Sequence, residues 1–163
     1  MSNIPTFSST ISRIQIIDAA RSWIGTPYVH QASAKGAGSD CLGLIRGVWR
    51  EIYGAEPEAP PAYTPDWSER HWREGSGDEA LLSAAGRHMI RRAPPTDKKA
   101  PAFEPGDVLV FRVAADGPAK HCGIASGPDQ FIHAYAGRQV TQSWLNRWWR
   151  ARLAGVFIFP GTE

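Results

Sequence analysis

The sequence predicts an α+β fold in which N-terminal helices pack on a central antiparallel sheet. Helical patterns with recognisable N-caps occupy the first third of the 163 residues, and short apolar runs separated by Gly and Pro turns occupy the last third. Short connections favour antiparallel pairing of neighbouring strands, and segregated helices and strands are typical of the α+β class. The length suits one domain, so we expect residues 1–163 to form a single unit.

The first helix is expected to begin after Ser12. Ser12 with Gln15 matches a capping box, and Gly25 with Pro27 provides the stop signal. The apolar residues at helical spacing between these signals are Ile16, Ile17, Ala20, Trp23 and Ile24.

The second helix is expected over residues 41–53, after a glycine-rich loop at 35–39. It is apolar on most sides, which indicates a buried helix. Gly43 and Gly47 lie four residues apart on one face, and each costs ~1 kcal/mol relative to Ala inside a helix. We therefore expect a neighbour, most simply the sheet, to pack closely against that face.

Residues 54–106 are rich in proline and are interpreted as a helical insertion within the domain. Thr64 before a proline predicts the start of a short helix. Ser76 with Glu79 matches a second capping box, from which a helix is expected to run to about Arg92.

The C-terminal third is expected to supply most of the sheet. Ser143 is expected to cap a tryptophan-rich helix before the last strand. The predicted strands cover residues 108–113, 121–126, 131–135, 138–142 and 155–159.

Composition excludes several classes of function. The formal charge of +2 is too small to indicate a nucleic-acid partner. No segment approaches the ~18 apolar residues of a membrane span, and the N-terminus lacks the pattern of a signal peptide. The 7 Trp residues are compatible with core packing or with an exposed carbohydrate or partner surface. For such a surface the candidates are Trp144, Trp148 and Trp149.

Cys41 is the first candidate for chemistry. Ser39 or Asp40 is a suitable N-cap, so Cys41 falls in the first turn of the buried second helix. The partial positive charge at a helix N-terminus lowers the pKa of a thiol and favours the nucleophilic thiolate. The N–H groups of the same turn can also stabilise an oxyanion. A structural core cysteine is the alternative interpretation.

His121 and His133 are the candidates for the groups that would activate Cys41. A cysteine nucleophile needs a base that is distant in sequence and adjacent in the fold, and His121 begins a predicted strand far downstream. His133 lies in the next predicted strand, so a hairpin can bring both imidazoles to one face, where His133 would orient His121. Structural histidines, satisfied by ordinary packing, remain the alternative for both.

Metal and disulfide interpretations are less favoured. Cys41, His121, Cys122 and His133 have the side chains of zinc ligands, but His121 and Cys122 are neighbours on a strand and point to opposite faces. No CxxC or HExxH pattern occurs, and two cysteines do not make a disulfide framework. We expect neither a metal nor another cofactor. The sequence also lacks the serine elbow and the P-loop.

Several motifs together resemble the NlpC-type cell-wall peptidases. Asp40–Leu44 is similar to the nucleophile motif of that family, His121–Ile124 to its histidine strand, and Phe131–Ala134 to the strand of its third polar residue. Gly25–Tyr28 is similar to its upstream tyrosine segment and Pro105–Val108 to the start of its first sheet strand. The order and spacing agree over about residues 13–159.

The resemblance implies a papain-like fold and hydrolysis of amide bonds in peptidoglycan stem peptides, usually between γ-D-glutamate and a diamino acid. By position, Cys41 is then the nucleophile, His121 the base and His133 its orienting partner. Tyr28 becomes a wall of the site. Asp40 and Leu42 lie at the substrate and oxyanion side, with Leu42 standing where many members carry a small polar residue.

The stretch from His30 to Glu51 is most similar to the phage-associated and gene-transfer-agent branch. This implies a protein made in the bacterial cytoplasm, carried at the tail tip of a phage-like particle and acting on the periplasmic cell wall, with tail or hub proteins as partners. A catalytically silent hub protein with the same fold is the alternative from another class. An amidase or acyltransferase would differ only in substrate.

Overall fold

The computed structural model describes residues 9–62 and 79–163. The helix predicted at Thr64 and the cap predicted at Ser76 lie outside these described residues. The elements in chain order are α1 (Arg13–Arg21), β1 (Ser33–Ala34), β2 (Gly38–Ser39), α2 (Cys41–Tyr53), α4 (Ala80–His88), β3 (Ile90–Arg91), β4 (Val108–Arg112), β5 (Ala119–Ala125), β6 (Gln130–Ala134), β7 (Val140–Trp144), α5 (Arg147–Ala151) and β8 (Leu153–Ile158).

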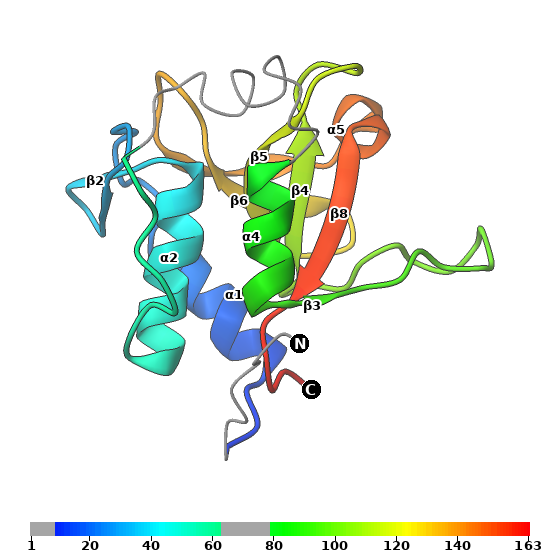
Figure 1. Ribbon diagram of the computed structural model, residues 1–163, viewed down its shortest axis with the longest axis horizontal. Helices are drawn as coiled ribbons and strands as arrows, with labels where there is room; N and C mark the ends of the chain where they lie inside the picture. Colours follow the sequence, from blue (N-terminus) through cyan, green and yellow to red (C-terminus); the bar gives the residue numbers. More distant parts are fainter. Residues whose placement is uncertain (1–8, 63–78) are drawn as a thin grey trace.

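A six-stranded sheet in the order β3-β8-β4-β5-β6-β7 forms the centre of the molecule, and all its neighbouring strands are antiparallel. Helices α1, α2 and α4 gather on one face of this sheet (Figure 1). The short helix α5 and the loop at Phe103 contribute to packing on the other face. The predicted α+β class, with N-terminal helices on an antiparallel sheet, is confirmed.

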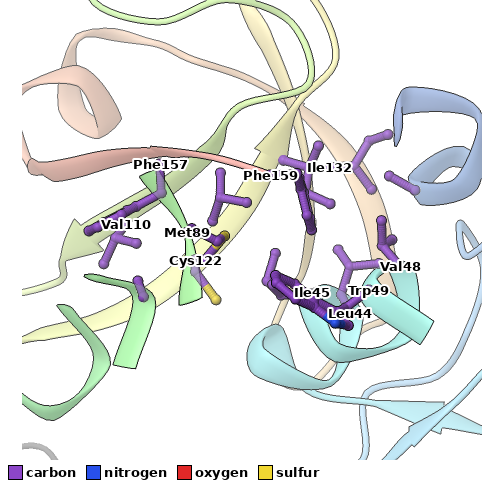
Figure 2. Packing of buried hydrophobic residues seen from close by; sticks show 14 of the residues in the cluster. Leu44, Ile45, Val48, Trp49, Met89, Val110, Cys122, Ile132, Phe157 and Phe159 are labelled. Carbon is purple, nitrogen blue, oxygen red and sulfur yellow. The ribbon is translucent and has the colours of Figure 1, made fainter. Parts of the chain in front are cut away.

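The main core lies between the sheet and the three helices. Figure 2 shows side chains of α2 facing side chains of the sheet, among them Cys122 of β5, with Met89 next to Cys122. A smaller cluster on the opposite face includes Phe111, Phe131 and Leu145, with Trp149 packed against it. Because the sheet is covered on both faces, β4 reads as a continuous apolar run rather than an alternating one.

Helix α1 begins as predicted at a complete capping box. The Ser12 hydroxyl accepts from the Gln15 N–H at 3.2 Å, and the Gln15 side chain accepts from the Ser12 N–H at 2.8 Å. The glycine face of α2 differs from the expectation. A Cβ on Gly47 would overlap the Trp23 ring, and one on Gly43 would overlap the Ala32 carbonyl. The close neighbours are therefore Trp23, just beyond α1, and a loop, rather than the sheet.

Two predictions around the insertion and the tryptophan-rich helix are wrong. Helix α4 ends at His88, because Ile90 and Arg91 pair with β8 at the edge of the sheet instead of continuing the helix to Arg92. Ser143 does not cap α5, because it belongs to β7. Asn146 is the N-cap instead, and its side chain accepts from the Trp149 N–H at 3.1 Å.

The other strands agree with the predicted ones within about two residues, which is ordinary at element ends. β7 starts two residues late because the turn after β6 extends through Gly137 and Arg138. Within this turn Tyr135 and Gln139 form a backbone hydrogen bond of 3.1 Å. Within the described ranges, no helix has the length and apolarity needed to cross a bilayer.

Candidate active site

Cys41 lies at the head of α2, in a cleft of about 590 Å³. Its side chain is half-buried and packs against the main core. The cleft is walled by the start of α2, the segment 28–30, the start of β5, the end of β6 and helix α5. The predicted residues Tyr28, Asp40, Leu42 and His121 all line it with Cys41.

His121 and His133 contact each other as the hairpin prediction requires. The His121 Nε2 atom lies 2.7 Å from the His133 Nδ1 atom, across the neighbouring strands β5 and β6. Gly123 provides the space for this contact. A Cβ there would lie 2.7 Å from the Ile132 carbonyl oxygen and 3.0 Å from the His133 Cβ.

Ser143 is a member of this hydrogen-bonded chain that the sequence did not indicate. The second nitrogen of His133, Nε2, lies 2.8 Å from the Ser143 hydroxyl. Residues two apart on a strand share a face, and Thr141 stands opposite His133 in the register, so Ser143 is a diagonal neighbour. Extending the predicted strand from Gln142 to Trp144 would have revealed this placement.

Aromatic rings enclose the two imidazoles. The Phe131 ring stacks on His133 with centroids 4.2 Å apart. The Trp149 ring lies 5.2 Å from His121 and 5.4 Å from His133. Trp149 is thus a packing residue of the site. By contrast, Trp148 and Trp144 are 43% and 68% exposed, and Trp148 lines the cleft.

Cys41 is surrounded by groups that favour its thiolate. A hydrogen bond from the Cys122 thiol is the largest influence that lowers the pKa of Cys41 well below its ordinary value. A hydrogen bond from His121 and the charge of that imidazole lower it further, against the opposing effect of burial. The pKa of Cys122 is raised by its bond to Cys41 and by burial, so Cys122 remains a protonated donor.

The Cys41 sulfur lies beside the start of β5, where the strand is irregular. The β4–β5 register shifts beside Lys120, where Phe111 pairs with His121 but Arg112 pairs with Ala119. Such a bulge re-aims side chains locally. The Cys41 sulfur lies 3.8 Å from the Lys120 carbonyl oxygen. His121 contacts the aromatic cluster and Cys122 the main core, so their side chains take opposite faces as predicted.

His133 is fully buried, with 0% of its surface exposed. Burial, with a smaller effect from the charge of His121, lowers the pKa of His133 to about 3. His133 is therefore a neutral imidazole near neutral pH. Burial also raises the pKa of Tyr28 to about 12, with help from the charges of Cys41 and Asp40. Its hydroxyl stays protonated and able to donate in the cleft.

Asp40 organises the backbone around the nucleophile. One carboxylate oxygen accepts from the Gly43 N–H at 2.7 Å and caps α2, and the other accepts from the Gln31 N–H at 2.8 Å. Gln31 is held at a φ of 62°, a conformation that is uncommon for a residue with a side chain. Leu42 and Leu81 line both the cleft and a small apolar cavity of about 110 Å³ beside α4.

No metal-binding constellation was found in residues 9–62 and 79–163, where no three His, Cys, Asp or Glu side chains are grouped to hold an ion. Cys41 and Cys122 are both free thiols. Within the described chain, the site consists of one activated thiol, an imidazole pair and the N–H groups at the head of a helix. This set can carry out nucleophilic attack on a carbonyl with proton transfer to a leaving group.

Comparison with known proteins shows to which family the chain is similar. The model of the NlpC/P60 family matches residues 25–157. A gamma-DL-glutamyl hydrolase of Bacillus subtilis is 28% identical over 90% of the chain, and a murein DD-endopeptidase/murein LD-carboxypeptidase of Escherichia coli is 27% identical over 85%. The chain spans only 29% and 58% of the lengths of these two relatives.

Solved structures show the same fold. An NlpC/P60 family protein of Bacillus cereus aligns with a TM-score of 0.59 and 21% identity, covering 95% of this chain and 41% of that one. The NlpC/p60 domain of the peptidoglycan hydrolase SagA aligns with a TM-score of 0.52 and 24% identity, covering 90% of this chain and 98% of the domain.

Proposed function

This chain belongs to the NlpC/P60 family, and from that premise we propose that it is a cysteine peptidase that hydrolyses peptide stems of bacterial peptidoglycan. The observation that carries the proposal is that the sulfur of Cys41, at the head of α2, shares a cleft with His121, which lowers its pKa and which lies 2.7 Å from His133. The name of the E. coli relative, a murein endopeptidase, supports murein as the substrate.

The resting enzyme in this mechanism holds a thiolate and an imidazolium. Because Nε2 of His121 contacts His133, its Nδ1 is the nitrogen left to exchange a proton with Cys41. The Cys122 thiol and the charge of His121 stabilise the thiolate. His133 accepts the Nε2–H of His121 and holds the ring in position.

Acyl transfer follows from this arrangement. The Cys41 sulfur attacks the amide carbonyl, and a tetrahedral intermediate forms. The N–H groups of the first turn of α2 and the Tyr28 hydroxyl stabilise its oxyanion. His121 then gives its proton to the departing amine, which leaves a thioester on Cys41. A water molecule, deprotonated by His121, attacks the thioester, and the carboxylic acid leaves as the thiol is restored.

A digestion experiment tests the proposal. Purified sacculi are incubated with the wild-type chain and with Cys41→Ala, and the released muropeptides are identified by mass. We expect defined amide cleavage by the wild type and none by Cys41→Ala, with the same far-UV circular dichroism for both. Full digestion by the variant, or release of sugars without peptide cleavage, would exclude the mechanism.

Two finer statements are also proposed. The first is that the bond lies between γ-D-glutamate and a diamino acid, which the name of the B. subtilis relative, a gamma-DL-glutamyl hydrolase, supports. Mass analysis of the new termini tests it, because cleavage after D-glutamate leaves an L-alanyl-D-glutamate end. A free D-alanine end would instead indicate a different bond.

The second is that the protein acts from the tail tip of a phage-like particle, on the resemblance of the stretch from His30 to Glu51 to phage-associated peptidases. Antibody labelling of purified particles tests it and predicts signal at the tail end. Rapid alkylation of Cys41 near neutral pH would separate an active particle-bound enzyme from a catalytically silent hub protein, whose cysteine would react slowly.

A further inference from the structure

Ser143 ends a hydrogen-bonded chain that starts at the nucleophile. His121 Nε2 lies 2.7 Å from His133 Nδ1, and His133 Nε2 lies 2.8 Å from the Ser143 hydroxyl. Both ring nitrogens of His133 are therefore engaged, one by the base and the other by β7. Ser143 lines neither the sulfur nor the cleft, so any effect on the reaction passes through His133.

We propose that Ser143 is a positioning residue, whose hydroxyl accepts the Nε2–H of His133 and so selects the tautomer that leaves a lone pair on Nδ1 for His121. This inference rests on the proposed function, since it assumes that His121 serves as the base. It adds a residue to the site and gives the direction of each hydrogen bond.

The direction follows from the protons that the reaction requires. When His121 is an imidazolium, both of its nitrogens are donors, so His133 must accept at Nδ1. His133 is neutral near neutral pH, and a neutral imidazole has a single proton, which must then lie on Nε2. The atom in contact with Nε2 is the Ser143 oxygen, and a hydroxyl oxygen accepts readily.

The surroundings of His133 leave few substitutes for Ser143. The ring is fully buried and stacks on Phe131 at 4.2 Å, with Trp149 near its edge. An N–H buried among such rings has no water to bond to, so it is left unsatisfied, at a cost in free energy, when its acceptor is removed. Without the Ser143 oxygen, the His133 tautomer with its proton on Nδ1 competes with the Nε2-protonated tautomer, because it no longer leaves an unsatisfied N–H at Nε2.

That second tautomer opposes catalysis. A proton on Nδ1 of His133 points at the Nε2–H of the His121 imidazolium, so the thiolate–imidazolium pair is weakened. When His121 is neutral, the same proton forces Nε2 of His121 to accept, and the His121 proton moves to the nitrogen that faces Cys41. The base then faces the thiol with a donor instead of a lone pair.

The test compares Ser143→Ala and Ser143→Thr with Thr141→Ala, a half-buried hydroxyl on the same face of β7. For Ser143→Ala we expect kcat to fall about 10-fold or more with KM within about 2-fold, as the loss of a buried hydrogen-bond acceptor predicts. The acid limb of the pH–rate profile should move to higher pH. Ser143→Thr should restore most of the rate, and Thr141→Ala should change it little.

A double-variant cycle and NMR make the result specific. Ser143→Ala should add almost nothing to the loss caused by His133→Ala, because residues that act as a unit are not additive. The ¹⁵N shifts of the His133 ring should show a protonated Nε2 in the wild type and a mixed or Nδ1-protonated ring in Ser143→Ala.

Two outcomes would overturn the inference: a proton on Nδ1 of His133 in the wild type, or additive losses in the double variant. The NMR readout needs no substrate, so it can succeed or fail independently of the proposed peptidase activity. A wild type with the expected tautomer but no action on sacculi would reject the proposed function while leaving the hydrogen-bond assignment in place.

Discussion

Cys122 follows the proposed base in the chain and donates a hydrogen bond to the proposed nucleophile in space. From the sequence it was a packed cysteine or a minor candidate for a disulfide. In the fold it is buried between the sheet and α2, and its pKa is raised while the pKa of Cys41 is lowered. One thiol thus stabilises the charge on the other, because a hydrogen bond to an ionised acceptor is stronger than a neutral one.

Removing that donor should raise the pKa of Cys41. Hydrogen bonds to charged groups contribute about 1.5–3 kcal/mol, so Cys122→Ala should move the pKa of Cys41 clearly upward. The midpoint of the pH dependence of iodoacetamide alkylation at Cys41 measures this shift. Cys122→Ser keeps a donor and should shift the midpoint less. Equal midpoints for wild type and Cys122→Ala would show that this thiol is only packed.

Gly123 should resist substitution because its missing side chain makes room for the histidine pair. In Gly123→Ala the new methyl would press on the Ile132 carbonyl and on His133, and overpacking of this kind costs about 1–3 kcal/mol. We expect a lower urea midpoint together with a lower kcat. Gly127→Ala is the matched control, since a Cβ there meets no neighbouring atom within 4 Å. Similar losses in both variants would contradict the steric account.

At the scale of the element, α2 combines two functions in one helix. Its N-terminus presents Cys41 and the unpaired N–H groups of the first turn, and Asp40 holds that end by capping the helix and by binding the Gln31 N–H. Its glycine face lets Trp23 approach closely, and the Trp23 indole donates to Glu51 at 3.0 Å. The contacts that fix the position of α2 therefore also fix the position of the Cys41 side chain.

Two helical glycines should respond oppositely to the same substitution. Gly47→Ala would drive a methyl into the rigid Trp23 ring and should destabilise the protein by about 1–3 kcal/mol. Gly86→Ala, on the exposed side of α4 with nothing near its Cβ position, should stabilise it by roughly 0.5–1 kcal/mol. Urea denaturation of both variants gives the comparison, and a stabilised Gly47→Ala would disprove the close contact.

At the scale of the whole molecule, the site lies where the helical layer, the sheet and the aromatic cluster of the far face meet. Cys41 comes from the helices, His121 and His133 from the sheet, and Trp149 from α5. Burial of His133 among these layers keeps it neutral. A neutral imidazole in a folded core makes the stability of the whole protein depend on pH.

That dependence has a definite sign. Burial lowers the pKa of His133 from 6.5 to about 3, so between these values the unfolded chain binds a proton that the folded protein does not. Stability from this group is complete above about pH 6.5 and is lost as pH falls, by up to ~1.4 kcal/mol per unit. Urea unfolding of wild type and His133→Asn from pH 4 to 7 should show a shallower slope for the variant. Parallel slopes would contradict the burial of a neutral ring.

The class of the fold, the order of most elements and the candidates Cys41, His121 and His133 could all be predicted from the sequence. These inferences depend on local chemistry: a capping box, apolar periodicity, turn residues, and a cysteine after an N-cap. The Trp-rich segment and the glycine face of α2 also stand out in the sequence, but the residues that pack against them cannot be identified from it.

Those neighbours became known only from the folded structure. A strand pattern specifies which residues share a face but not which residue of the next strand lies diagonally across, so Ser143 was assigned to a helix cap instead of to His133. Likewise the packing of Cys122 in the core beside Cys41, and the pairing of Ile90 with β8, which ends α4, arise from contacts between distant segments. Local sequence cannot encode such contacts, because their free energy exists only once both partners are in place.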